Sequence, residues 1–209
     1  MLKPFKPHDI AMLAFFFIMM SLMFTFPIVP VLIGIYACLT LAALFWMYAD
    51  RRYATDKARV TIGKSIVYII GGFIVALAIQ IVGLQLTMFL TGADSTAVSN
   101  ADEVKSAIDR SKLFILVVII SAPIFEEVVF RGILFKRLAD RGYFWPAITF
   151  SSLFFAVAHF QELALLVFLL LGCLLAYLYQ VTNRLIVPMA VHFLNNGMAL
   201  LGLLLTNQL

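Results

Sequence analysis

Charged residues are scarce in this sequence. Aspartate, glutamate, lysine and arginine make up 12% of its 209 residues, whereas 64% of the residues are hydrophobic. An average soluble domain has about 25% charged residues. A water-soluble globule of this length could not bury so much apolar surface, because its own surface must be largely polar. The composition excludes soluble enzymes, secreted disulfide scaffolds, disordered proteins and nucleic-acid-binding proteins. It predicts an all-α, polytopic transmembrane helix bundle in the lipid bilayer, with no nucleic-acid partner.

Cysteine and the common enzyme signatures are also scarce. The two cysteines, Cys38 and Cys173, lie inside apolar runs, so we interpret them as small buried hydrophobic residues without a disulfide. The sequence contains no HExxH zinc helix, no GxSxG nucleophile motif and no phosphate-binding P-loop. Catalysis by a serine or cysteine paired with histidine stays open, although no feature singles out Ser121 or Cys173.

Long apolar segments fill most of the chain. A helix needs about 20 apolar residues to cross a bilayer, so this length accommodates about six to eight crossings. Pro27 and Pro30 predict a tight turn between the first two. Lys3 and Lys6 precede the first apolar run as in a signal peptide, but no cleavage site with a polar mature region follows, so we expect retained helices. Residues 1–209 are interpreted as one membrane domain. The seven predicted spans are 10–27, 30–49, 65–90, 112–135, 145–160, 163–180 and 185–206.

The distribution of charge predicts an orientation. The polar loop 91–111, which would lie outside, carries most of the acidic residues of its side. Basic residues concentrate on the cytoplasmic side of multi-pass proteins, so we expect a cell-membrane protein with a cytoplasmic N-terminus and an external C-terminus. With that orientation, eleven of the 15 basic residues are cytoplasmic: Lys3, Lys6, Arg51, Arg52, Lys57, Arg59, Lys64, Lys136, Arg137, Arg141 and Arg184.

Two adjacent carboxylates, Glu126 and Glu127, lie near the middle of the fourth predicted span. Charge is costly in hydrocarbon, so ionisable residues within a span are functional candidates. Neighbours on a helix point about 100° apart, so the two carboxylates should face different directions. Glu127 and Arg131 are four residues apart and are expected to form an ion pair. Glu126 then remains free for chemistry, unless all three residues form one structural network.

Two histidines and an asparagine occur in later spans. His159 lies near the end of the fifth span, and its imidazole could act as a base, a hydrogen-bond donor or a ligand. His192 and Asn196 are four residues apart in the last span, so both side chains face the same way. The alternative for His159 is a structural role, and the alternative for His192 and Asn196 is a polar pair that joins two helices.

These three polar patches resemble, in order and spacing, the three motifs of the CPBP family of membrane proteases. That family comprises type II CAAX prenyl endopeptidases and bacteriocin-processing or abortive-infection-like intramembrane proteases. Each motif alone is weak, but all three on successive spans are specific. The resemblance covers about residues 112–206. The motifs read Glu126-Glu127-x-x-x-Arg131, Phe155-x-x-x-His159 and His192-x-x-x-Asn196.

The resemblance implies an intramembrane endopeptidase. Glu126 would be the catalytic carboxylate that activates water, helped by His159. His192 and Asn196 would polarise the scissile carbonyl and hold the oxyanion. These roles are chemically reasonable, because a poorly solvated carboxylate is a competent base and two donors on one helix face can stabilise an oxyanion.

The resemblance leaves the cofactor open between a metal-free glutamate mechanism and a metalloprotease. Glu126, His159 and His192 could form a three-ligand zinc site with an open position for water. We favour the metal-free mechanism, without a cofactor, because the sequence lacks a dedicated ligand helix. In either case, the resemblance implies that Glu127 and Arg131 brace the site.

The expected substrates are membrane peptides or membrane proteins, because the compact chain shows no soluble domain. Such a compact chain is typical of a bacterial plasma-membrane member of the family. Two other function classes stay open. A proton-coupled transporter could use Glu126, His159 and His192 as a relay, but it would usually show repeat symmetry. A non-catalytic immunity or scaffold protein on the same fold would tolerate loss of Glu126.

The predicted orientation can be tested by cysteine labelling in intact cells. Ser99→Cys in the external loop should react with a membrane-impermeant thiol reagent. Thr55→Cys in the cytoplasmic loop 50–64 should react only after permeabilisation. The reverse pattern would overturn the orientation, because the positive-inside rule places the basic segments in the cytoplasm.

Overall fold

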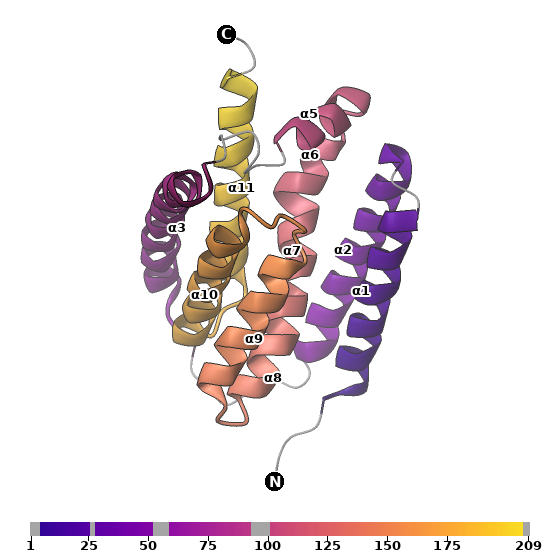
Figure 1. The fold of residues 1–209 in the computed structure, drawn as a ribbon. Helices are drawn as coiled ribbons and strands as arrows, with labels where there is room; N and C mark the ends of the chain where they lie inside the picture. The colour runs from indigo at the N-terminus through magenta and orange to yellow at the C-terminus, as the bar shows by residue number, and fades with distance from the viewer. Residues whose placement is uncertain (1–4, 26–27, 52–58, 93–100, 207–209) are drawn as a thin grey trace.

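The computed structural model describes residues 5–25, 28–51, 59–92 and 101–206, which form helices joined by turns (Figure 1). The predicted all-α class is confirmed, since no strand occurs within these ranges. In chain order, the elements are α1 (Pro7–Thr25), α2 (Val29–Arg51), α3 (Ile62–Thr91), α5 (Ala101–Arg110), α6 (Phe114–Leu116), η1 (Val117–Ser121), α7 (Ala122–Glu127), η2 (Val128–Phe135), α8 (Lys136–Ala139), α9 (Phe144–Val157), α10 (Leu165–Thr182) and α11 (Ile186–Thr206).

Each predicted span coincides with a helical segment whose ends differ by a few residues. Four helices are long and apolar enough to cross a membrane, and the helices Pro7–Met23 and Phe144–Val157 are shorter but also apolar. Large hydrophobic side chains are exposed on the outer surface, as at Phe89 (84%) and Trp145 (74%). This surface suits lipid, and the chain is a membrane helix bundle. The four long helices are Val29–Asp50, Ile62–Thr91, Leu165–Thr182 and Ile186–Leu205.

Some residues used in the sequence analysis lie outside the described ranges, and the predictions made for them stay predictions. They are Lys3, Pro27, Arg52, Thr55, Lys57 and Ser99.

The cysteines are free thiols, and one of them departs from expectation. Cys173 is partly buried, but Cys38 is exposed, so its interpretation as a buried residue was wrong. Cys38 lies on the face of α2 that points outward to the lipid, together with exposed apolar residues such as Leu41 and Phe45. An apolar sequence in a membrane helix therefore does not by itself indicate burial in protein.

An ionic cluster joins the N-terminal helices to α8. The buried Asp9 accepts hydrogen bonds from Arg137 Nε (2.7 Å), Arg137 Nη2 (2.9 Å) and Trp46 Nε1 (2.9 Å). Asp50 accepts from Lys6 Nζ at 2.8 Å and from Arg137 Nη2 at 2.9 Å. The start of α1, the end of α2 and the start of α8 therefore meet at one end of the bundle. This arrangement agrees with the predicted grouping of Lys6 and Arg137 on one side of the membrane.

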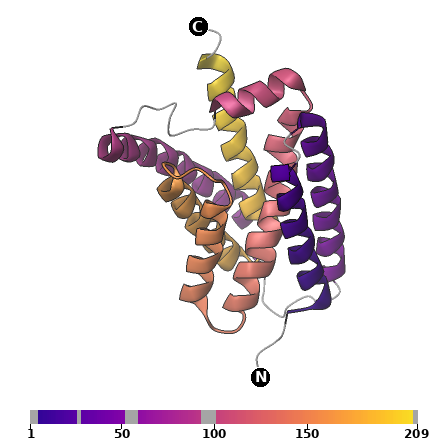
Figure 2. The same cartoon turned by 45° about the vertical axis from the view of Figure 1, so that its right-hand side comes forward.

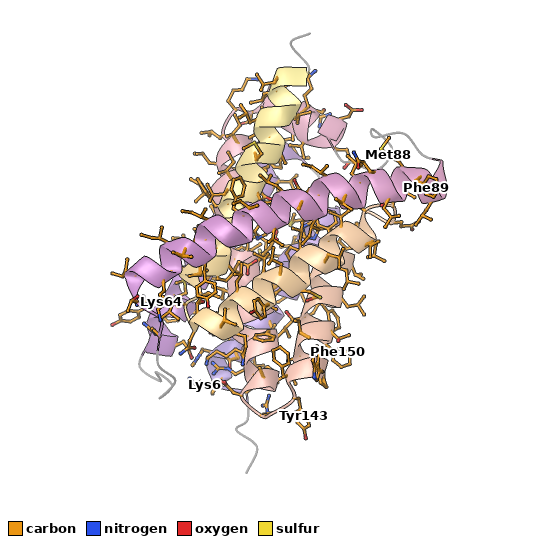
Figure 3. The ribbon with its side chains drawn as sticks, turned by 90° about the vertical axis from the view of Figure 1, so that its left-hand side faces the viewer. Lys6, Lys64, Met88, Phe89, Tyr143 and Phe150 are labelled. Carbon is orange, nitrogen blue, oxygen red and sulfur yellow. The ribbon has the colours of Figure 1, made fainter. Side chains whose placement is uncertain are left out.

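Helix α3 crosses the bundle obliquely (Figures 2 and 3). Its 30 residues span about 45 Å, which exceeds a hydrocarbon core of about 30 Å and requires tilt. A Cβ atom added to Gly72 would lie 2.7 Å from Leu178 of α10, and one added to Gly83 would lie 2.8 Å from Val167. Small residues thus let α3 pack closely on α10 and α11. The buried residues of α3 are Ser65, Gly72, Ala76, Gly83 and Thr87.

The prediction that residues 91–111 form a loop was wrong for its second half. Residues Ala101–Arg110 form the amphipathic helix α5, which lies across the same end of the bundle as the end of α11 (Figure 1). Ile108 is 2% exposed, and Val104 and Ala107 are partly buried on the same face. This i, i+3, i+4 pattern is the helical signal, and the polar composition of the segment masked it.

The fourth predicted span is one continuous helical run, but it is not a uniform α-helix. Two π-helical stretches, η1 and η2, flank the short α-helical segment α7 that carries Glu126 and Glu127. Hydrogen bonds in a π-helix reach one residue further back than in an α-helix, and such stretches occur frequently at functional sites. The local widening changes where side chains on either side of α7 point.

Helix α9 is too short to cross a bilayer and stops before the end of the bundle at which α5 lies (Figure 1). Its 14 residues extend about 21 Å. The following turn places Phe160 at a positive φ of 52°, a conformation that costs a non-glycine residue about 1–2 kcal/mol. Non-helical backbone at membrane depth is tolerated where it lines a cavity or packs on protein. The turn thereby holds His159 inside the bundle.

We expect Gly172→Ala to destabilise the bundle. A Cβ atom at Gly172 would lie 2.9 Å from Ser152 Cα and 3.2 Å from Ser152 O, so α10 must move away from α9. Overpacking of this kind costs about 1–3 kcal/mol, measurable as a lower unfolding midpoint in detergent. Gly71→Ala is the matched control, because nothing lies within 4 Å of the added atom. Equal midpoints for both variants would contradict the close α9–α10 contact.

Candidate active site

Three elements far apart in the sequence bring Glu126, His159 and His192 together. Glu126 lies in α7, His159 in the turn after α9, and His192 in α11. Glu126 Oε2 lies 4.0 Å from His159 Nε2 and 3.8 Å from His192 Nε2. These side chains are 14%, 21% and 5% exposed, respectively. The structure therefore joins residues from all three sequence motifs in one site.

Glu127 is fully buried and binds two partners through one oxygen. Its Oε1 accepts a hydrogen bond from Arg131 Nη1 at 3.0 Å and lies 3.0 Å from His192 Nδ1. The expected ion pair of Glu127 with Arg131 is present. The expected separation of the two carboxylates is incomplete, however, because His192 contacts Glu127 through one ring nitrogen and faces Glu126 through the other.

Arg131 connects η2 to α9 and α10. Its Nη2 donates to the backbone carbonyl of Gly172 at 3.2 Å, and its guanidinium carbon lies 4.3 Å from the centre of the Phe155 ring. The side chain is fully buried. A carboxylate, a carbonyl and an aromatic face thus compensate its charge in a site without bulk water.

The hydrogen bonds of the two histidines indicate where their protons are. His159 Nδ1 lies 2.7 Å from the carbonyl oxygen of Phe155, which can only accept, so Nδ1 donates. By the same reasoning, His192 Nδ1 donates to the Glu127 carboxylate. In a neutral ring, Nε2 is then an acceptor. Both rings direct this second nitrogen toward Glu126.

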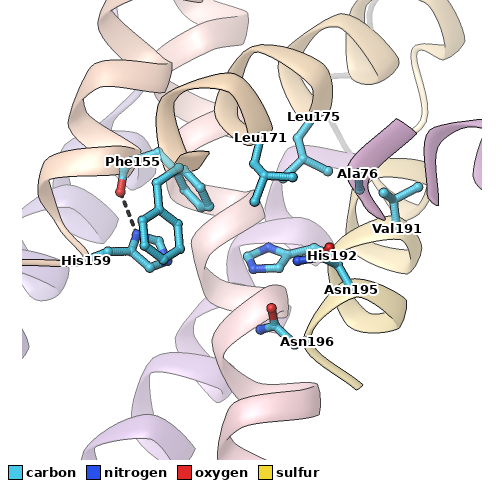
Figure 4. Close-up of a pocket in the computed structure, with 10 residues that line it drawn as sticks. Ala76, Phe155, His159, Leu171, Leu175, Val191, His192, Asn195 and Asn196 are labelled. Atoms are coloured by element: carbon cyan, nitrogen blue, oxygen red, sulfur yellow. Dashed lines mark hydrogen bonds between the residues drawn. The ribbon is translucent and has the colours of Figure 1, made fainter. Parts of the chain in front are cut away.

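A cavity of about 30 Å³ adjoins these groups and is lined by His159, His192, Asn195 and Asn196 (Figure 4). This volume accommodates a water molecule. Asn196, which the sequence analysis grouped with His192, donates from Nδ2 to the carbonyl of Val118 in η1 at 3.0 Å. One donor of this amide therefore already has a partner within the bundle.

Sequence reasoning missed three contributions to the site. Phe155 was named only as part of the second motif, without a role, yet its ring contacts Arg131, His159 and His192. Phe168 stacks on His159 with a centroid distance of 4.0 Å, and nothing in the sequence distinguishes it from the other phenylalanines. Asn195 lines the cavity, and its position next to Asn196 was the available signal.

The zinc alternative is not supported by the arrangement of side chains. Across the described ranges, no group of three His, Cys, Asp or Glu side chains is arranged to hold a metal ion. Glu126 Oε2 is 3.8–4.0 Å from the two imidazole nitrogens.

The family model for Type II CAAX prenyl endopeptidase Rce1-like proteins matches residues 109–198. The chain is 30% identical over 164 residues to the putative membrane peptidase YdiL of Bacillus subtilis, a match that covers 78% of this chain and 67% of the relative. It is 32% identical over 144 residues to the membrane-embedded CAAX protease MroQ of Staphylococcus aureus, covering 66% of this chain and 58% of the relative. No solved structure matches the chain significantly.

We expect the two adjacent carboxylates to differ in their effect on stability. Glu127→Gln leaves the buried Arg131 without its carboxylate, and breaking a buried pair from one side costs about 3–5 kcal/mol. Glu126→Gln breaks no hydrogen bond of Oε2, which has no partner, and His192 can lose its second proton to balance the lost charge. Unfolding in detergent, followed by circular dichroism, should show a large loss for Glu127→Gln only. Equal losses would contradict the distinct roles of the two residues.

Proposed function

This chain belongs to the CPBP family of membrane proteases, and we propose that it hydrolyses peptide bonds of membrane-associated peptides or proteins with a water molecule activated by Glu126. One observation carries the proposal. The buried Glu126 Oε2 has no hydrogen-bond partner and lies within 4.0 Å of two imidazole nitrogens, and both of these imidazoles line a water-sized cavity. Glu127 Oε2 and Arg131 Nε are also unpaired, but those two side chains are held through their other atoms, whereas both imidazole rings direct a nitrogen toward Glu126 Oε2.

In the proposed first step, the water oxygen attacks the carbonyl carbon of the scissile bond and Glu126 takes the water proton. His159, whose Nδ1 donates to Phe155, accepts a second hydrogen bond from the water through Nε2. The new C–O bond forms as the carbonyl π electrons move to the oxygen, which becomes an oxyanion. The carboxylate and the imidazole orient the water and raise its nucleophilicity.

His192 is the proposed oxyanion donor. Because its Nδ1 donates to Glu127, donation from Nε2 requires the doubly protonated ring. Glu126 and Glu127 as anions, with Arg131 and His192 as cations, make these four buried groups neutral in sum. Charge neutrality lowers the cost of burying them, and a preorganised cation strongly stabilises a developing oxyanion.

In the second step, the tetrahedral intermediate collapses. Glu126 returns its proton to the amide nitrogen, the C–N bond breaks, and a carboxylic acid and an amine leave. Asn196 acts as a positioning residue in this scheme. Its hydrogen bond to the carbonyl of Val118 holds α11, which carries the oxyanion donor His192, against η1. Glu127 and Arg131 orient His192 and do not touch the reacting atoms.

The activity can be tested with the full chain in proteoliposomes. The probes are a set of internally quenched fluorogenic membrane peptides, and mass spectrometry of the products identifies the cleaved bond. Glu126→Gln should lower the rate by at least about 10²-fold, because it removes the general base. Glu162→Gln makes the same change at an exposed position outside the cavity and should retain activity.

Two further results would decide the mechanism in the same assay. Activity should survive dialysis against a strong chelator if Glu126 and His159 activate the water alone. Loss of activity that is restored by added zinc would overturn the metal-free mechanism. Full activity of Glu126→Gln would overturn the assignment of the general base.

A further inference from the structure

Asn195 is a buried polar residue whose oxygen has no internal partner. The side chain lies in α11, three residues after His192, and the residue is 5% exposed. Asn195 Oδ1 is buried without a hydrogen-bond partner, whereas the amide of its neighbour Asn196 donates to Val118. An unsatisfied buried acceptor costs about 1–3 kcal/mol. Such a cost is typically retained where the group serves function.

The surroundings of Asn195 direct this oxygen to the cavity. The cavity wall contributed by α3 and α10 is apolar and consists of Ala76, Phe168, Leu171 and Leu175, which offer no donor. The polar groups on the wall belong to His159, His192 and the two asparagines. The oxygen of Asn195 can therefore obtain a hydrogen-bond donor from a ligand that binds in the cavity.

We propose that Asn195 accepts a hydrogen bond from a backbone N–H of the peptide substrate beside the scissile bond. This inference rests on the proposed protease function. A peptide must leave its helical conformation to expose a scissile bond, and its freed backbone groups then need partners in a membrane interior. An amide oxygen on the helix turn after His192 is placed to accept from such a group while His192 faces the carbonyl.

Substrate binding is the direct test. Each variant is made in the inactive Glu126→Gln background, and the dissociation constant of a fluorescent peptide that the wild type cleaves is measured by anisotropy. Asn195→Leu removes the acceptor at similar volume and should weaken binding about 10- to 100-fold. In the active background, KM should rise by the same factor with kcat nearly unchanged, as expected for binding shared by ground and transition states.

Stability separates this role from a structural one. Replacing an unpaired buried amide by an apolar side chain should leave the unfolding midpoint of Asn195→Leu equal to or above that of the wild type. Ser152→Ala is the matched control. Ser152 Oγ is also buried without a partner, but it lies between α9 and α10 and does not line the cavity. This variant should change neither binding nor KM.

Three results would overturn the proposal. The first is unchanged peptide affinity in Asn195→Leu. The second is a fall in kcat with unchanged affinity, which would assign Asn195 to the water. The third is an equal loss of affinity in Ser152→Ala. If Asn195→Leu does not fold, Asn195→Ala gives the same readouts. A wild type that cleaves no peptide counts against the protease function itself, whereas normal cleavage with normal affinity in Asn195→Leu counts only against Asn195.

Discussion

The buried contact of Glu127 with Arg131 and His192 is the interaction on which the site depends. One carboxylate oxygen meets a guanidinium and an imidazole, each at 3.0 Å. Arg131 extends the contact to Gly172 of α10, and His192 extends it to α11. Three helical segments are thereby held in one register. Ions without partners are very costly in hydrocarbon, so this network has few alternative arrangements. Glu126 precedes Glu127 in α7, and its position is therefore fixed as well.

The packing around this network follows from small residues. Membrane helices gain little from hydrophobic association, since lipid is as apolar as their side chains, so close approach of backbones matters more. Gly172 lets α10 lie against Ser152 of α9, and Gly72 lets α3 lie against α10 and α11. This close packing brings the backbone carbonyl of Gly172 within hydrogen-bond distance of Arg131. They also bring Ala76 to the cavity wall.

Two departures from regular helix create room for chemistry. Helix α9 stops inside the bundle, which puts His159 at the depth of Glu126, and π-helical stretches lie on both sides of α7. The polar groups proposed to bind the water lie at these departures: Glu126 is in α7, and His159 is in the turn after α9.

The sequence by itself determined the membrane class, the seven helical segments and the residues of the three motifs, since hydrophobic run length and costly intramembrane charge are local signals. It also indicated the Glu127–Arg131 pair, because four-residue spacing is a local property of a helix. Only the tertiary structure decided that His192 lies between the two carboxylates, that Phe155 and Phe168 pack on the histidines, and that Asn195 has a buried oxygen without a partner. These are relations between helices distant in the chain, set by tilt, small-residue contacts and π-helical stretches. Helix α5 was missed although its apolar residues recur with helical spacing, because its polar composition is typical of a loop.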